Sequence, residues 1–190
     1  MSTQHSQRHS HDDPALKEDI HLLQQGDMDA MERIYKKFQQ SVYSFCIRMM
    51  GNQYEAKDAI QEVFLRVIEY RESAPVEHFP AWLFKVTRTV CLNLLRKRRA
   101  HEEYNDEIYT VSTFGKERDF SLIEVIEQAL QQLPPSLREI VILREYDGYS
   151  YQEISALLDI ELSLVKVRIH RARLSLRKIL EPIAGEIRFL

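Results

Sequence analysis

Two clusters of basic side chains are the groups in this sequence best suited to a binding role. Residues 85–99 contain six arginines and lysines without one acid, and residues 163–178 contain six more, again without an acid. Between them, residues 101–132 hold eight acids against two bases. The net charge is only -3, so the chain as a whole is no nonspecific nucleic-acid coat. The distribution predicts two binding modules with cationic surfaces, joined by an acidic connector.

No other group of residues in the sequence shows the spacing of a catalytic, cofactor-binding or metal-binding motif. Neither a glycine-rich phosphate loop, nor a His-Glu-x-x-His signature, nor a metal-spaced set of His, Cys and Asp is present, so we expect no catalytic residue, cofactor or metal. His5, His9 and His11 lie in a polar tail without visible geometry for a metal. Cys46 and Cys91 each lie in an apolar stretch and are expected to be reduced core thiols, although a redox or metal-sensing role stays open.

Composition predicts an all-α protein, because only 5 glycines and 6 prolines interrupt a chain of 190 residues rich in helix formers. We expect two small helical domains joined by a flexible acidic linker. The boundaries are a disordered tail at 1–14, a first domain at 15–99, the linker at 100–120 and a second domain at 121–190. No apolar stretch is long enough for a membrane span or a secretory signal, so the protein is expected to be cytoplasmic.

The helix after Gly51 has the clearest periodicity of the N-terminal half. Asn52, with Glu55 three residues on, indicates its start, and one stripe along it is apolar. The opposite face places an apolar leucine among polar and acidic residues, as a docking surface would. The group comprises Asp58, Gln61, Glu62, Leu65 and Glu69. A loop at 73–77 and a helix from about Phe79 to Arg98 follow.

The C-terminal part predicts a helix-turn-helix. Ser121 with Glu124, and Ser150 with Glu153, resemble capping boxes that open helices, and Pro134 ends the first of these. Pro135 begins a helix through about Tyr146. A short helix at 151–158, a turn at 159–162 and a long helix capped by Ser163 form the motif.

The outer face of the long helix is basic. With Val165, Ile169, Ala172 and Leu176 placed inward, that face carries no acid and extends about 27 Å, which fits a DNA major groove. Lys166, His170 and Arg171 are candidates for reading bases, and Arg177 and Lys178 for the backbone. The outer residues proposed for DNA binding are Ser163, Lys166, Val167, His170, Arg171, Arg177 and Lys178. Arg168 and Arg173 flank the buried stripe and either pair with acids on preceding helices, such as Glu153, or contact DNA.

Several short motifs together resemble a known family. They are Asp58-Ala59-Ile60-Gln61-Glu62-Val63-Phe64, Trp82-Leu83-Phe84-Lys85-Val86 leading to Arg96–Arg99, Leu133-Pro134, residues 149–154, and Val165-Lys166 with His170-Arg171-Ala172-Arg173. In this order and spacing, over about residues 20–182, the chain resembles the extracytoplasmic-function (ECF) sigma factors of the bacterial sigma-70 family.

The resemblance implies a function without catalysis. A first domain of this type (region 2) binds the clamp helices of RNA polymerase and melts the promoter -10 element, and a second (region 4) binds the polymerase flap and the -35 element. The group around Leu65 would then dock on polymerase, and the loop from Ser73 to His78 would capture an unstacked -10 base. The residues implied for -10 DNA are Ser73, His78, Lys85, Arg88, Arg96 and Arg99. Control by an anti-sigma factor, and a stress or envelope-response regulon, are also implied.

The chain departs from the family pattern at several positions. Asp159 stands where glycine is usual in the turn, and would adopt the left-handed conformation at some cost. Leu164 and Val167 replace small polar residues, which leaves the promoter sequence open. Two alternatives are a stand-alone dimeric helix-turn-helix regulator, which leaves the first basic cluster unexplained, and an enzyme acting on nucleic acid.

Overall fold

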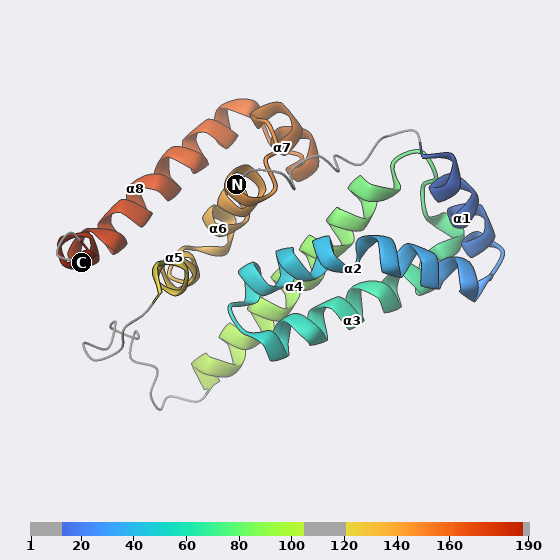
Figure 1. The fold of residues 1–190 in the computed structure, drawn as a ribbon, viewed down its shortest axis with the longest axis horizontal. Coiled ribbons are helices and arrows are strands. Elements are labelled where there is room, and N and C mark those ends of the chain that lie inside the picture. The colour runs from blue at the N-terminus through green and yellow to red at the C-terminus, as the bar shows by residue number, and fades with distance from the viewer. Residues whose placement is uncertain (1–12, 105–120, 188–190) are drawn as a thin grey trace.

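The computed structural model describes residues 13–104 and 121–187, and in these two ranges every regular element is a helix (Figure 1). This confirms the all-α prediction. The predicted tail lies almost wholly outside the described residues, as does the linker from residue 105 on. The elements are α1 (Pro14–Gln24), α2 (Met28–Met50), α3 (Gln53–Glu69), η1 (Arg71–Ser73), α4 (Phe79–Tyr104), α5 (Leu122–Gln131), α6 (Pro135–Val141), η2 (Ile142–Tyr146), α7 (Tyr151–Leu158) and α8 (Leu162–Ile187).

Helices α1 to α4 form an N-terminal bundle, in which α2, α3 and α4 pack side by side (Figure 1). Side chains cap the helices: Asp27 accepts from the backbone of α2, and Asn52, as the sequence predicts, accepts from Glu55 N at 2.8 Å. Gly51 ends α2 in the left-handed conformation, with φ 83°. Helix α4 continues to Tyr104, beyond the end expected near Arg98.

Helices α5 to α8 form a C-terminal bundle. Both predicted capping boxes are present, since the Ser121 and Ser150 hydroxyls accept from the backbone of Glu124 and Glu153, whose side chains bond back to the cap residues. The helix that begins at Pro135 runs to Tyr146 as expected, but its last five residues form a π-helix, η2. There the Asp147 N–H donates to the Ile142 carbonyl.

The helix-turn-helix lies at α7 and α8. Asp159 ends α7 with φ 54° and ψ 53°, the left-handed conformation expected at this position. Ser163 was predicted to cap the final helix, and that prediction is wrong by two residues, because Glu161 precedes the first residue of the helix. Helix α8 starts at Leu162, and the Glu161 carbonyl accepts from Leu164 N and Val165 N.

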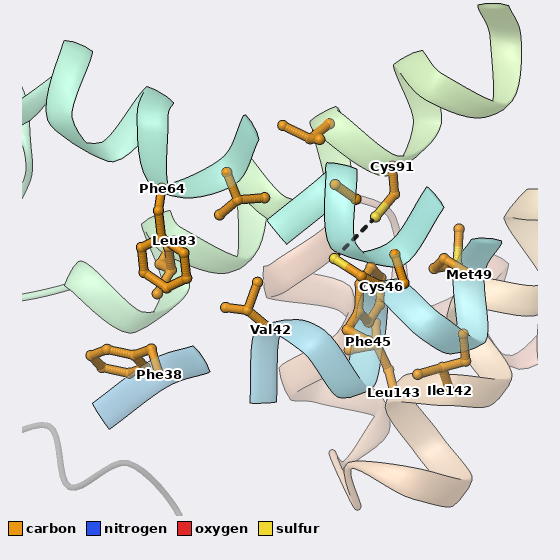
Figure 2. Packing of buried hydrophobic residues seen from close by; sticks show 14 of the residues in the cluster. Phe38, Val42, Phe45, Cys46, Met49, Phe64, Leu83, Cys91, Ile142 and Leu143 are labelled. Atoms are coloured by element: carbon orange, nitrogen blue, oxygen red, sulfur yellow. Dashed lines mark hydrogen bonds between the residues drawn. The ribbon is translucent and has the colours of Figure 1, made fainter. Parts of the chain in front are cut away.

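The two bundles share one continuous apolar core rather than lying apart. Ile142 and Leu143, on η2, are fully buried in the same cluster as Phe45 and Met49 of α2 (Figure 2). Cys46 and Cys91 are also fully buried there and are free thiols, as expected of core cysteines. Their sulfurs lie 3.7 Å apart (Figure 2). Among the described helices, none has an apolar stretch able to cross a membrane.

Candidate nucleic-acid interface

Helix α8 separates an apolar face from a basic one. Val165 and Ala172 are fully buried and Ile169 is 3% exposed, so the stripe predicted to face inward does so. All seven outer residues proposed for DNA binding are exposed: Ser163, Lys166, Val167, His170, Arg171, Arg177 and Lys178. The sequence therefore located this face correctly, whereas its contact with DNA stays a prediction.

Arg168 and Arg173, on the flanks of the stripe, pair with acids on preceding helices. The Arg173 guanidinium lies 2.8 Å from Glu145, and that of Arg168 lies 3.8 Å from Glu139. Both arginines thus pair with acids on preceding helices, which was one of the two expectations for them. The acid named in that expectation, Glu153, is not the partner, and its side chain caps α7. In the described part of the chain, Lys166, Arg171, Arg177 and Lys178 have no ion pair.

The α3 face that we proposed for docking points to solvent. Leu65 is 62% exposed, and Asp58, Gln61 and Glu69 around it are exposed as well. Glu62 is half-buried, because its carboxylate pairs with Arg66 at 2.8 Å. An exposed leucine among acids on a rigid helix suits a partner surface with an apolar centre and a basic rim.

The first basic cluster is only partly directed outward. Lys85, Arg96 and Arg99 are exposed along α4, and Ser73 and His78 are exposed in the segment before it. The Ser73 hydroxyl donates to the Tyr70 carbonyl at 3.1 Å. Arg88 differs from Lys85, Arg96 and Arg99, because its guanidinium group turns toward the C-terminal bundle.

Arg88 binds Glu139 of α6 with both ends of its guanidinium group. Its Nε lies 2.7 Å from Oε2 and its Nη2 lies 3.0 Å from Oε1. The Glu139 side chain is only 1% exposed, whereas that of Arg88 is 29% exposed. This is the fork-to-fork geometry that arginine also uses on phosphate. The contact links positions 51 residues apart and ties α4 to α6.

The C-terminus of α2 receives two more contacts from the C-terminal bundle. Arg138, which is 4% exposed, donates to the Met49 carbonyl, and Gln131 Nε2 donates to the Arg48 carbonyl at 2.7 Å. Arg48 in turn stacks over the Tyr146 ring at 4.2 Å. Free carbonyls at a helix end need donors, so these contacts satisfy them across the bundle boundary. Burial lowers the pKa of Arg138 to about 10, which still leaves it charged at neutral pH.

Sequence reasoning missed Gln131, Arg138 and Glu139. The sequence did contain a signal, since two adjacent charged residues, Arg138 and Glu139, interrupt the apolar run from Leu137 to Leu143. Charges in such a run are expected to be paired when buried. The partners in the N-terminal bundle, namely Arg88 and the carbonyls of Arg48 and Met49, could not be read from the sequence, because they lie far away along the chain.

Comparisons with known proteins agree with this architecture. Residues 34–101 match Sigma-70 region 2, and residues 123–176 match Sigma-70 region 4. The chain is 30% identical over 177 residues to the ECF RNA polymerase sigma factor SigE of Mycolicibacterium smegmatis, covering 85% of this chain and 66% of SigE. It is 32% identical over 166 residues to the RNA polymerase sigma factor CarQ of Myxococcus xanthus, covering 85% and 95%.

A solved structure shares the fold. The sigma factor RpoE of Bartonella quintana, in complex with the anti-sigma factor NepR, has a TM-score of 0.60 at 22% identity. The match covers 79% of this chain and 96% of that one.

The region 2 match accounts for the N-terminal half, which a stand-alone helix-turn-helix regulator would leave unexplained. The alternative of an enzyme acting on nucleic acid is wrong, since sigma factors are non-enzymatic initiation factors. The two regions are matched in family order, and the chain covers 95% of a relative that is 32% identical to it. The chain therefore belongs to the ECF sigma factors of the sigma-70 family and directs transcription.

Proposed function

We propose that this sigma factor binds core RNA polymerase through α3 and promoter DNA through α4 and α8. Residues 15–99 would dock on the clamp and open the -10 element, and residues 121–190 would bind the flap and the -35 element. Residues 100–120 would connect them. The protein would act in the cytoplasm, at promoters of a stress or envelope-response regulon.

The basic outer face of α8 carries the proposal. It follows a capped helix and a left-handed turn at Asp159, which is the arrangement that sets a recognition helix into a major groove. Lys166, His170 and Arg171 lie in the first half of α8, where base edges come closest. Arg177 and Lys178 lie farther along, where phosphates do. All five are exposed, so no rearrangement within the C-terminal bundle is needed to reach DNA.

The role of the N-terminal bundle is proposed from two surfaces. The exposed Leu65 with its polar and acidic neighbours Asp58, Gln61, Glu62 and Glu69 suits clamp docking. The exposed Lys85, Arg96 and Arg99 on α4 suit the phosphates of melted -10 DNA. Ser73 and His78 lie just before α4 and are proposed to hold an unstacked base.

Control by an anti-sigma factor is part of the proposal. A structural neighbour was solved in complex with the anti-sigma factor NepR. Release from such a partner would then couple a signal to transcription, and a membrane-bound partner would hold the protein near the membrane. Purification of the native protein with whatever accompanies it would identify the partner.

Reconstituted transcription tests the function. Purified chain and core RNA polymerase are mixed with a library of genomic promoter fragments, and transcripts are mapped by sequencing. We expect starts at a defined set of promoters that core polymerase alone does not use. As a control, a chain with Lys166→Ala and Arg171→Ala should lose these starts while still binding core polymerase. Absence of specific starts with a well-folded, inhibitor-free protein would refute the proposal.

A further inference from the structure

We propose that helix α1 holds residues 73–78 in the shape that captures an unstacked base, with Gln24 and Lys17 as the positioning residues. This inference rests on the proposed function in one respect, namely the capture of a -10 base by Ser73 and His78. Helix α1 precedes residues 34–101, which match Sigma-70 region 2, so the family match assigns it no role. In Figure 1, α1 lies beside the segment that joins α3 to α4.

Gln24, which is half-buried, anchors the start of this segment. Its Nε2 donates to the Ala74 carbonyl at 2.9 Å, across 50 positions of sequence. The other end of the same amide, Oε1, lies 3.3 Å from Nδ1 of His21 on α1. Since an amide oxygen only accepts, this contact supports the orientation in which the amide nitrogen faces Ala74. Ala74 is 2% exposed and its neighbour Ser73 is exposed, so the bond fixes the backbone beside a proposed base-binding side chain.

Lys17 contacts the end of the same segment. Its Nζ lies 3.0 Å from Oε2 of Glu77, and the two side chains are 28% and 66% exposed. Glu77 directly precedes His78, the second proposed base-binding residue, which is exposed as well. Lys17 and Gln24 are seven residues apart and therefore lie on one face of α1, two turns from each other. This face thus holds the segment at two points, each next to a side chain proposed to meet the base.

The segment depends on such contacts because no helix lies between Ser73 and Phe79 to fix its shape. Val76 packs against the apolar core at its middle, which leaves the backbone on either side to be held by α1. A binding segment that is ordered in advance avoids the cost of ordering on association. Discrimination between bases also requires polar groups at accurate positions, since a displaced group no longer distinguishes one base edge from another. Loss of the α1 contacts should therefore reduce base preference more than general DNA affinity.

Four variants on α1 and its end test the positioning role without altering a residue proposed to contact DNA. Gln24→Leu removes the donor to Ala74 and keeps a side chain of similar size. Gln25→Leu is the matched control, because Gln25 is the next residue, is exposed, and makes no side-chain hydrogen bond within the described part of the chain. Lys17→Met removes the ion pair with Glu77, whereas Lys17→Arg retains it. Circular dichroism establishes that each variant is folded.

Base preference is measured with the full-length chain bound to core RNA polymerase. The probes are fluorescently labelled single-stranded oligonucleotides with the -10 sequence of a promoter found by reconstituted transcription, each position being changed to all four bases. We expect Gln24→Leu to lower the affinity ratio between preferred and other bases by about fivefold, the effect of one ordinary hydrogen bond. Lys17→Met should lower the ratio by about twofold, because a largely exposed ion pair contributes less. Lys17→Arg and Gln25→Leu should match the unaltered chain.

Hydrogen exchange followed by mass spectrometry reports on the segment itself. Peptides that cover residues 73–78 should exchange faster in Gln24→Leu than in Gln25→Leu, because the segment has lost an anchor. Affinity for a double-stranded -35 probe should be the same in both variants, since α8 is unchanged. These two measurements distinguish a local change in the segment from general damage to the fold.

Ser73→Ala and His78→Ala separate this inference from the proposed function. If either lowered base preference while Gln24→Leu and Lys17→Met did not, the positioning role of α1 would be disproved. If neither lowered it, base capture by the segment would fail and this inference with it, while the exchange rates would still establish whether α1 anchors the segment. Equal losses of base preference and of -35 binding would also contradict the inference. Should Gln24→Leu not fold, Lys17→Met and its rescue by Lys17→Arg decide.

Discussion

The Arg173 guanidinium donates to the Glu145 carboxylate at 2.8 Å, joining α8 to the π-helix η2. The contact directs one of the six basic residues of this segment away from the outer face of α8. Arg168 is directed toward Glu139 in the same way. The basic cluster seen in the sequence therefore divides into residues that hold the bundle together and residues that face solvent.

Substitutions along α8 should have distinct effects on DNA binding. Arg171→Ala should weaken binding mainly at one -35 base pair, by about 1–3 kcal/mol, since it removes a base contact. Arg177→Ala should weaken binding to all sequences alike. It should also reduce the slope of log affinity against log salt concentration by about one, because one phosphate contact is lost. Affinities for a set of single-base promoter variants, measured at several salt concentrations, distinguish the two.

Arg173→Ala is the control for this comparison. Its ion pair is largely exposed, so DNA affinity and stability should change little. Equal losses across all sequences for Arg171→Ala and Arg177→Ala would contradict the division of the helix.

Leu65→Glu should reduce binding to core RNA polymerase by at least about tenfold, because the docking face would lose its apolar centre. The melting temperature should not fall, since the leucine is 62% exposed. Binding is measured by competition with a labelled chain. Leu122→Glu, at a leucine 58% exposed on α5, is the matched control, and an equal loss there would argue against a local docking face.

Arg138→Met should lower the free energy of unfolding by about 3 kcal/mol. The variant keeps most of the side-chain volume but leaves the buried carbonyls of Leu133 and Met49 without this donor. Urea denaturation followed by circular dichroism measures the loss. Arg177→Met, at an exposed site, should change it by less than about 0.5 kcal/mol. A similar small change at Arg138 would mean that other donors replace it.

Asp159 should be a site where a glycine stabilises the protein. Asp159→Gly should raise the free energy of unfolding by about 0.5–1 kcal/mol, because the residue holds φ 54° and only glycine does so without steric cost. Asp159→Val should lower it by about 1–2 kcal/mol. Thermal unfolding gives both values, and a destabilising glycine would show that the aspartate side chain matters more than its backbone.

The two thiols should resist alkylation in the folded protein. Cys46 and Cys91 are fully buried, and the contact with Cys46 together with burial raises the pKa of the Cys91 thiol well above its ordinary value. The reactive thiolate form of Cys91 is therefore disfavoured, and burial keeps the reagent away from both sulfurs. Mass spectrometry after iodoacetamide treatment should show both thiols modified rapidly in urea and slowly without it. Rapid labelling of the native protein would revive a redox-sensing role.

How far the sequence predicts this fold depends on the range of the interactions. Helix starts at Asn52, Ser121 and Ser150 were predictable because the cap and its partner lie three residues apart. Helix faces were predictable because burial follows the helical period, as at Val165 and Leu65. The start of α8 was misplaced, since Ser163 has the right chemistry for a cap but the backbone bonds begin from Glu161.

The long-range contacts were not predictable from the same rules. Arg88 carries the charge and spacing of a residue that follows phosphates, and nothing near it in sequence reveals Glu139, 51 positions later. The π-helix at Ile142–Tyr146 has no simple sequence signal either. Its last residue, Tyr146, stacks under the Arg48 guanidinium group of α2, so the geometry of the π-helix is linked to the packing of the bundles.

Gly51 fits closely against Gln131, since a Cβ added at position 51 would lie 2.5 Å from the Gln131 side chain. This fit bears on how such proteins exchange their two halves. A chimaera that joins this N-terminal half to the DNA-reading half of a relative would bring an unmatched residue to position 131, 138 or 139. Positions 51 and 131 should therefore be exchanged together, as should 88 and 139. We therefore expect a promoter preference carried by the C-terminal half to be transferred only together with that half's side of the boundary between the bundles.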